Sequence, residues 1–255
     1  MSAKQNRKID WEKRKLSTLV ALAWPIAVSM VSYSLMSVAD TYFVGSLGAS
    51  ALAGVGMAST LTWAGVCFAF GLLRAVKILV SQARGAGKLE QTREYLFSGK
   101  ILGVAIGLVL IIAVPVIEPG LRLLLDSEAA ADSAAAYFRV RMLSIPFLLM
   151  FVATREFRYG MGDTRLPMVA GVIANVLNVG LDFLFIMKLG WGVEGAACAT
   201  VIAVMVEWLI VLVPTWSSFW EGRSAGWVHV RSIVSIGAPS GLQFTLEMGS
   251  FTLLA

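Results

Sequence analysis

Asp40 is the charged side chain whose position most clearly suggests chemistry. It is the single charged residue between positions 16 and 73, in an otherwise apolar stretch. A carboxylate is costly in lipid, so such a residue usually faces the interior of a helix bundle and marks an ion pathway. Ser37, Met36 and Tyr33 precede it by three, four and seven residues and share its helical face, so we expect the Tyr33 hydroxyl to donate to the carboxylate. The alternative is an interfacial aspartate that caps the turn GSLG.

A second group of polar residues follows a helical spacing. Asn175, Asn178 and Asp182 stand at i, i+3 and i+7 and form one stripe on a predicted helix. Amides and a carboxylate in an apolar helix need partners from other helices. Thr200 and Glu207 are also seven residues apart and share a face, so Glu207 is expected either to extend such a network or to pair with a basic residue. The alternative for the whole set is polar contact that only holds helices together.

The composition indicates that most of the chain lies in a lipid bilayer. Of 255 residues, 58% are hydrophobic and 15% are charged, and the mean hydropathy is +0.78. An average soluble domain is about 25% charged. Cys67 and Cys198 both stand in apolar runs, where we interpret them as packing residues and not as a disulfide or a metal site. The sequence GAGK lacks the Walker spacing, and no nucleophile stands with a base, so neither an ATP-driven pump nor an enzyme is expected.

Seven apolar segments predict an all-α polytopic membrane protein. They cover residues 16–44, 51–80, 98–117, 134–154, 166–187, 194–214 and the stretch from 232 onward. A spanning helix needs about 20 predominantly apolar residues, and short connections rich in Gly, Pro and charge separate these segments. We therefore expect a basic tail at 1–15, a six-helix lobe at 16–215, a loop at 216–231 and the start of a seventh helix at 232–255.

The distribution of basic residues predicts the orientation. Most of the 21 Lys and Arg residues fall in the tail and in every second connection, whereas the opposite connections hold Arg122 and Lys188. By the positive-inside rule the N-terminus is cytoplasmic. The net charge of +5 is thus interpreted as a topology signal and not as a nucleic-acid surface. No signal-peptide pattern precedes the first span, so we expect that span to remain in the mature protein.

The last segment repeats the pattern of the first. When Pro239 is aligned with Pro25, IVSIGAPSGLQFT follows the apolar pattern of LVALAWPIAVSMV. This similarity suggests that a second six-helix repeat begins here, related to the first by an axis along the membrane normal.

Six stretches in the same order resemble the multidrug and toxic compound extrusion (MATE) family of transporters. They are the first span with its proline, aspartate and VGSLG turn, and then QARGAGK, YFRVRMLSIPF, YGMGDTRLPM, NVLNVGLDFLFIMKLGWGVEGAACATVI and APSGLQFTLE. The resemblance covers essentially the whole chain, as the first half of such a protein.

The resemblance implies a fold of twelve helices in two six-helix lobes around a central cavity. It implies a multi-pass protein of the bacterial inner membrane that exports organic cations, including drugs, in exchange for H⁺ or Na⁺ and without another cofactor. This chain would be the first half of such a protein, without most of the second lobe. Two alternatives remain: a lipid or precursor flippase of the same superfamily, whose large cationic cavity only Arg139 and Arg141 suggest here, and a fragment that does not transport.

The resemblance also implies residue roles. It assigns Asp40, Asn178, Asp182 and Thr200 to a cation site of the first lobe, and their oxygen atoms suit Na⁺ or a proton network. Glu247 of the seventh helix matches a glutamate that binds Na⁺ or a cationic substrate in the second lobe of some members. Tyr33, Ser37, Asn175 and Glu207 are expected to support the site, and Pro25 to allow the first helix to bend.

Overall fold

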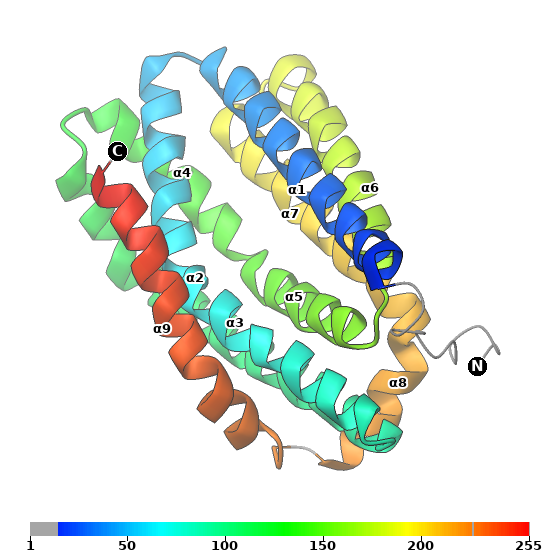
Figure 1. The fold of residues 1–255 in the computed structure, drawn as a ribbon. Coiled ribbons are helices and arrows are strands. Elements are labelled where there is room, and N and C mark those ends of the chain that lie inside the picture. The colour runs from blue at the N-terminus through cyan, green and yellow to red at the C-terminus, as the bar shows by residue number, and fades with distance from the viewer. Residues whose placement is uncertain (1–14, 226, 255) are drawn as a thin grey trace.

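The structure, a computed structural model, describes residues 15–225 and 227–254, and this part of the chain is almost entirely helical (Figure 1). The long helices are α1 (Lys15–Gly45), α2 (Ala49–Gly85), α3 (Leu89–Leu124), α4 (Glu128–Met142), α5 (Ile145–Gly160), α6 (Arg165–Asp182), α7 (Gly192–Leu212) and α9 (Val230–Leu254). Short elements are the π-helix Phe183–Lys188, the 3-10 helices Val213–Thr215 and Gly222–Ala225, and α8 (Trp216–Glu221). The predicted all-α membrane fold is confirmed.

Six spans account for the predicted six-helix lobe. Within the described residues, α1, α2, α3, α6 with its π-helix, and α7 with its continuation to Glu221 are each long and apolar enough to cross a membrane. The pair α4 and α5 makes a sixth span that bends by 50° at its break. The predicted seventh segment forms the helix α9, which does not belong to this set.

The helices form a layered bundle with α2 near its centre. α2 packs against α3, α4, α5 and α9, while α1 packs on α6 and α6 packs on α7. In Figure 1, α9 runs along one side of the molecule beside α2, and α1, α6 and α7 form a group on the other side, with α5 between them. Asp40 of α1, Asp182 of α6 and Thr200 of α7 therefore lie on helices that contact one another.

Glycines set how closely some of these helices approach. A Cβ on Gly107 of α3 would lie 2.7 Å from the Pro146 Cα of α5, and one on Gly71 of α2 would lie 2.5 Å from the Gly241 Cα of α9. Real Cβ contacts are essentially never that short. Small residues at membrane helix crossings allow this close backbone contact. Close packing matters here because lipid is as apolar as the side chains, so the hydrophobic effect does not drive helices together inside a membrane.

Helix ends differ from the sequence predictions. The predicted connection at 118–133 is mostly helical, because α3 continues through Pro119 to Leu124 and α4 begins after Ser127, whose side chain accepts from the Ala130 backbone N–H at 3.4 Å. The predicted loop at 216–231 contains α8, whose Phe219 ring lies 4.7 Å from the Lys100 Nζ of α3. The charged residues that suggested loops are thus accommodated on helices.

The break between α4 and α5 has a local cause. Leu143 and Ser144 form a turn, and Pro146 follows in the first turn of α5, where its missing N–H costs no helical hydrogen bond. The Ser144 hydroxyl donates to the Arg141 carbonyl at 2.7 Å and accepts from the Arg141 guanidinium. Both halves of the bent span pack against α7.

Candidate functional site

A chamber of about 580 Å³ lies inside the six-span lobe. Side chains of α1, α2, α4, α5, α6 and α7 line it, and none of the lining residues belongs to α9. Most of the wall is apolar, and Met30, Met36, Trp63, Phe70 and Phe151 contribute to it. A volume in this range is typical of pockets that hold drug-sized molecules.

Asp40, on the wall of this chamber, forms an acid pair with Asp182, which is buried and does not line the chamber. Asp40 lines the chamber from α1, and Asp182 ends α6 with 1% of its surface exposed. The two carboxyl groups lie within hydrogen-bonding range of each other. Two negative charges so close, in a medium of low dielectric constant, repel strongly. The acid pair therefore needs a proton or a metal cation between its oxygens.

Asn178 completes this group. Its side chain is fully buried, one turn before Asp182 on α6. With the amide turned to satisfy its neighbours, its nitrogen donates to Asp40 Oδ1 at 2.8 Å and to Asp182 Oδ2 at 3.3 Å. Asp182 Oδ1 remains buried without a hydrogen-bond partner. A buried carboxylate oxygen without a donor is a natural ligand for a small cation.

Thr200 lies beside the same group on α7. It lines the chamber, and it also lines, with Asp40 and Tyr137, an adjoining cavity of about 180 Å³. The Thr200 hydroxyl donates to the Ala196 carbonyl at 3.0 Å, which leaves its oxygen lone pairs available to a cation. The structure thus brings together the four residues that the sequence analysis assigned to one cation site.

A second polar group, the Glu207 cluster of Tyr33, Arg155 and Glu207, lies deeper along the same chamber. The Tyr33 hydroxyl donates to Glu207 Oε1 and joins α1 to α7. Arg155 of α5 lies within electrostatic range of Glu207. Tyr33 and Asp40 are seven residues apart on α1, so about 10 Å of helix separates this cluster from the acid pair. The expected hydrogen bond from Tyr33 to Asp40 is wrong, because Tyr33 faces Glu207 instead.

Of the residues predicted to support the site, Ser37 and Asn175 line the chamber, whereas Pro25 does not. Ser37 lines the chamber, and Asn175 lines it while donating to Ser32 Oγ of α1 at 2.8 Å. Pro25 lies inside α1 without ending the helix, and Ser29 Oγ donates to its carbonyl at 3.0 Å. The role of Pro25 in helix bending stays a prediction.

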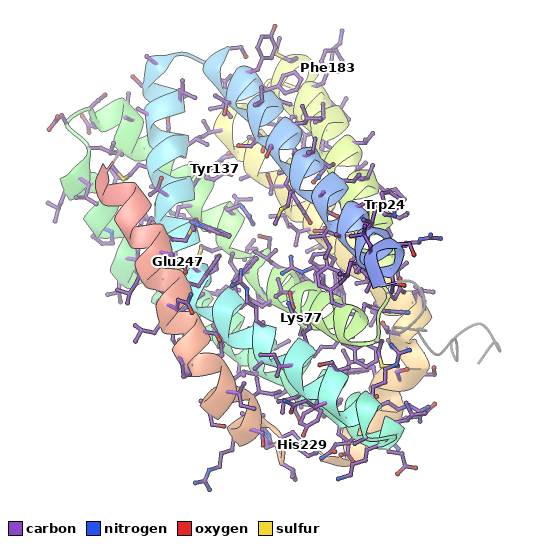
Figure 2. All side chains as sticks on the ribbon, viewed as in Figure 1. Trp24, Lys77, Tyr137, Phe183, His229 and Glu247 are labelled. Atoms are coloured by element: carbon purple, nitrogen blue, oxygen red, sulfur yellow. The ribbon has the colours of Figure 1, made fainter. Side chains whose placement is uncertain are left out.

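Glu247 lies apart from these residues. It is exposed on α9, along the side of the molecule away from α1 and α6 (Figure 2), and it accepts from Gln243 Nε2 at 2.8 Å. Its expected role in a second-lobe site therefore remains a prediction.

Arg155 is a chamber residue that the sequence analysis placed wrongly. We expected it in the connection after the fourth segment, where it begins the charged run REFR. α5 continues to Gly160, and Arg155 pairs with Glu156 inside the bundle. The helical spacing from Phe151, four residues earlier, was the available signal.

Arg139 and Arg141 have different surroundings although they are two residues apart. Arg141 lines the chamber within electrostatic range of Asp40. Arg139 points away and pairs with Glu118 of α3 at the surface of the lobe. Tyr137, labelled in Figure 2, also lines the chamber and has 7% of its surface exposed.

The comparison with protein families agrees with this arrangement. A family model described as MatE matches residues 25–184, which include the acid pair and Asn178. The chain belongs to the MATE family. Its similarity to individual members extends over most of its length.

Curated relatives are multidrug resistance proteins. "Multidrug resistance protein NorM" of Vibrio cholerae is 29% identical over 201 residues, covering 78% of this chain and 44% of the relative. "Probable multidrug resistance protein NorM" of Pseudomonas syringae pv. tomato is 30% identical over 257 residues, covering 95% of this chain and 55% of the relative. The chain spans about half the length of the curated relatives that it matches.

Solved structures of MATE and related transporters share the fold. A structure described as the "outward-facing conformation of a multidrug resistance MATE family transporter of the MOP superfamily" matches with a TM-score of 0.80 and 26% identity, over 92% of this chain and 53% of that one. A MOP superfamily transporter from Pyrococcus furiosus, whose description reports reverse polarity of its binding pocket, matches with a TM-score of 0.82, 26% identity and the same coverage.

Proposed function

We propose that this chain forms the first lobe of a cation-coupled antiporter that exports organic cations across the bacterial inner membrane. The observation that carries the proposal is the acid pair, in which Asp40 lines a drug-sized chamber and the buried Asp182 has an unpaired oxygen. The multidrug resistance proteins among its relatives support the substrate class. The second lobe that such a transporter contains would lie outside this chain.

The acid pair acts as the coupling site in this proposal. A proton or a sodium ion enters between Asp40 and Asp182, with Thr200 as a further oxygen ligand. When the cation arrives, the Asn178 amide turns its oxygen toward it, and when the cation leaves, the amide takes the orientation in which its nitrogen donates to both carboxylates. The side chain of Asn178 thus serves both states of the site.

In this proposal, the charge of the acid pair couples binding of the coupling cation to binding of the substrate. The carboxylate of Asp40 faces the chamber, where it attracts a cationic substrate while the acid pair is negative. Entry of the coupling cation removes that attraction, so the substrate leaves. Because the coupling is reciprocal, the substrate must also weaken binding of the coupling cation by the same factor.

A flippase for acidic lipids or precursors would use a strongly basic cavity. The chamber instead balances Arg141 and Arg155 with Asp40 and Glu207, and Arg139 lies outside it. This balance favours a substrate with a positive group.

The test is ethidium efflux from sealed vesicles that contain the chain together with a second lobe, under an imposed proton or sodium gradient. Efflux is expected with one gradient and is expected to be lost in Asp40→Asn, with normal membrane insertion. The matched control Asp132→Asn changes an exposed aspartate that pairs with Arg122 outside the chamber and should leave efflux unchanged. Full efflux by Asp40→Asn would contradict the proposal.

A further inference from the structure

Lys100 of α3 is a buried lysine whose ammonium group lacks a hydrogen-bond partner among the described residues. It has 3% of its surface exposed, and its Nζ atom makes no hydrogen bond there. The Phe219 ring of α8 covers it, with the ring centroid 4.7 Å from Nζ. A buried charge is costly unless it is paired and hydrogen-bonded, and an ammonium group has three donors. The ring compensates only part of this charge, because it accepts no conventional hydrogen bond.

A second buried cation, Arg158 of α5, lies within electrostatic range of Lys100. It has 7% of its surface exposed, and its Nη1 atom donates to Asp163 Oδ2 at 3.3 Å. Its Nε atom is buried without a hydrogen-bond partner in the described part of the chain. Two positive charges held close together away from water repel each other. An anion within reach of both would remove this repulsion and accept hydrogen bonds from their unused donors.

Two acids close in sequence to Lys100 and Phe219 have other partners. Glu221, at the end of α8, pairs with Arg93 of α3. Glu94 of α3 contacts His229 Nε2 at 2.8 Å. Both carboxylates are therefore already occupied, and neither hydrogen-bonds to Lys100.

Lys100 lies where the apolar part of α3 begins. Residues 101–117 carry no charge, and Glu118 follows them. This stretch corresponds to about 25 Å of helix, close to the thickness of the hydrocarbon core of a bilayer. Lys100 is thus expected at the depth of the lipid headgroups, at the end of the lobe that the basic residues predict to be cytoplasmic.

α8 has exposed aromatic side chains that suit the same depth. It packs against α3 at one end of the bundle (Figure 1), and Trp216 and Trp220 are 50% and 44% exposed. Tryptophan is enriched at the boundary between lipid and water. Phe219 packs on Phe97 of α3, with 5.0 Å between the ring centroids, and covers Lys100. A lipid headgroup beside α8 would therefore lie next to the two buried cations.

We propose that Lys100 and Arg158 bind the phosphate of an anionic lipid, and that α8 covers this site. The phosphate oxygens accept hydrogen bonds from the Lys100 ammonium and from Arg158 Nε, and Phe219 then moves off Lys100. Neither cation lines the chamber, so the inference does not depend on the proposed function. The alternative is that both cations are buried without any ligand.

Thermal unfolding of the full chain in detergent, with added phosphatidylglycerol or phosphatidylcholine of the same acyl chains, tests this site. Both lipids contain phosphate, but only phosphatidylglycerol has a net negative charge. Phosphatidylglycerol is expected to raise the midpoint of the wild-type chain by about 4 °C more than phosphatidylcholine does. Lys100→Met removes the charge and should lose most of this difference, whereas Lys100→Arg should keep it. The control Arg223→Gln removes a basic residue that contacts Trp220 of α8, and it should also keep the difference.

Arg158→Gln takes the place of Lys100→Met if that variant does not fold, and it should likewise lose most of the difference. Native mass spectrometry of the wild-type chain should show one tightly bound phosphatidylglycerol. The inference is overturned if the wild-type chain does not distinguish the two lipids, or if Lys100→Met distinguishes them as well as the wild type. Inorganic phosphate that stabilises the chain as much as phosphatidylglycerol also overturns it, because the site would then hold a free anion and not a lipid.

Discussion

At the scale of residues, the account depends on a few oxygen atoms that converge from three helices. Asp40, Asn178 and Asp182 contact one another, and Thr200 lies beside them with its lone pairs available. Oxygen ligands of this kind suit a small hard cation, which is the role we propose for them. The described residues contain no group of three or more His, Cys, Asp and Glu side chains that could hold a metal ion.

Substitutions of Thr200 test whether its hydroxyl is one of the ligands of the coupling cation. Thr200→Val removes the hydroxyl with little change of volume, and Thr200→Ser keeps it. If the coupling cation is sodium, the valine variant should bind it about tenfold more weakly and the serine variant nearly normally. Sodium-dependent thermal stabilisation of the purified chain measures this. Equal sodium binding by both variants would remove Thr200 from the site.

The sequence singled out both residues of the acid pair, and Tyr33 and Glu207 of the Glu207 cluster, but not Arg155. Asp40 and Asp182 stood out because isolated charge in apolar segments is expensive and needs a reason. Arg155 did not, because it begins a charged run that is typical of a connection between spans. Tyr33 was assigned to the correct face but to the wrong acid, since helical spacing specifies a face and not a partner.

At the scale of elements, the site depends on how closely helices pack behind the chamber. The bent span α4–α5 supplies Tyr137, Arg141 and Arg155, and α3 supports it from outside the chamber. Gly107 of α3 makes this support possible, since any side chain there would meet the Pro146 backbone.

Gly107→Ala is therefore expected to destabilise the lobe by about 1–3 kcal/mol, as overpacking usually does. Gly120→Ala is the matched control on the same helix, because a Cβ there meets nothing within 4 Å. Thermal unfolding of the purified chain in detergent should show a lower midpoint for the first variant only. Equal midpoints for the two variants would show that α3 and α5 do not pack this closely.

Hydrophobic patterning predicted the existence of the helices but not their ends. The predicted third segment, 98–117, is shorter than α3, which begins at Leu89, carries Arg93 near its start and continues past Lys100. Arg93 pairs with Glu221 and Lys100 contacts the Phe219 ring, so α8 covers these charges. The break in the fourth span was also missed, because Pro146 at the start of a helix gives the same sequence signal as a proline inside one.

At the scale of the whole molecule, the described residues form one lobe, and its helices α1, α2, α4, α5, α6 and α7 line the chamber. The start of α9 continues from this lobe and packs on α2 through Gly71, Gly237 and Gly241. The relatives are about twice as long, which agrees with the expectation that a second repeat begins at this helix.

The orientation of the lobe can be checked directly. The distribution of basic residues predicts that Arg223 lies on the cytoplasmic side and Lys188 on the opposite side. In a chain without Cys67 and Cys198, a cysteine at position 188 should react with an impermeant maleimide in intact cells. A cysteine at position 223 should react only after permeabilisation. The reverse pattern would invert the proposed topology.

The dependence of ethidium affinity on pH and on sodium concentration tests the central claim most directly. The claim is that Asp40 and Asp182 share a cation that competes with the substrate, so ethidium should bind more weakly to the wild-type chain as protons or sodium are added at constant ionic strength. In Asp40→Asn this dependence should disappear. An ethidium affinity that is unaffected by both cations in the wild-type chain, or that responds equally in the variant, would contradict the account.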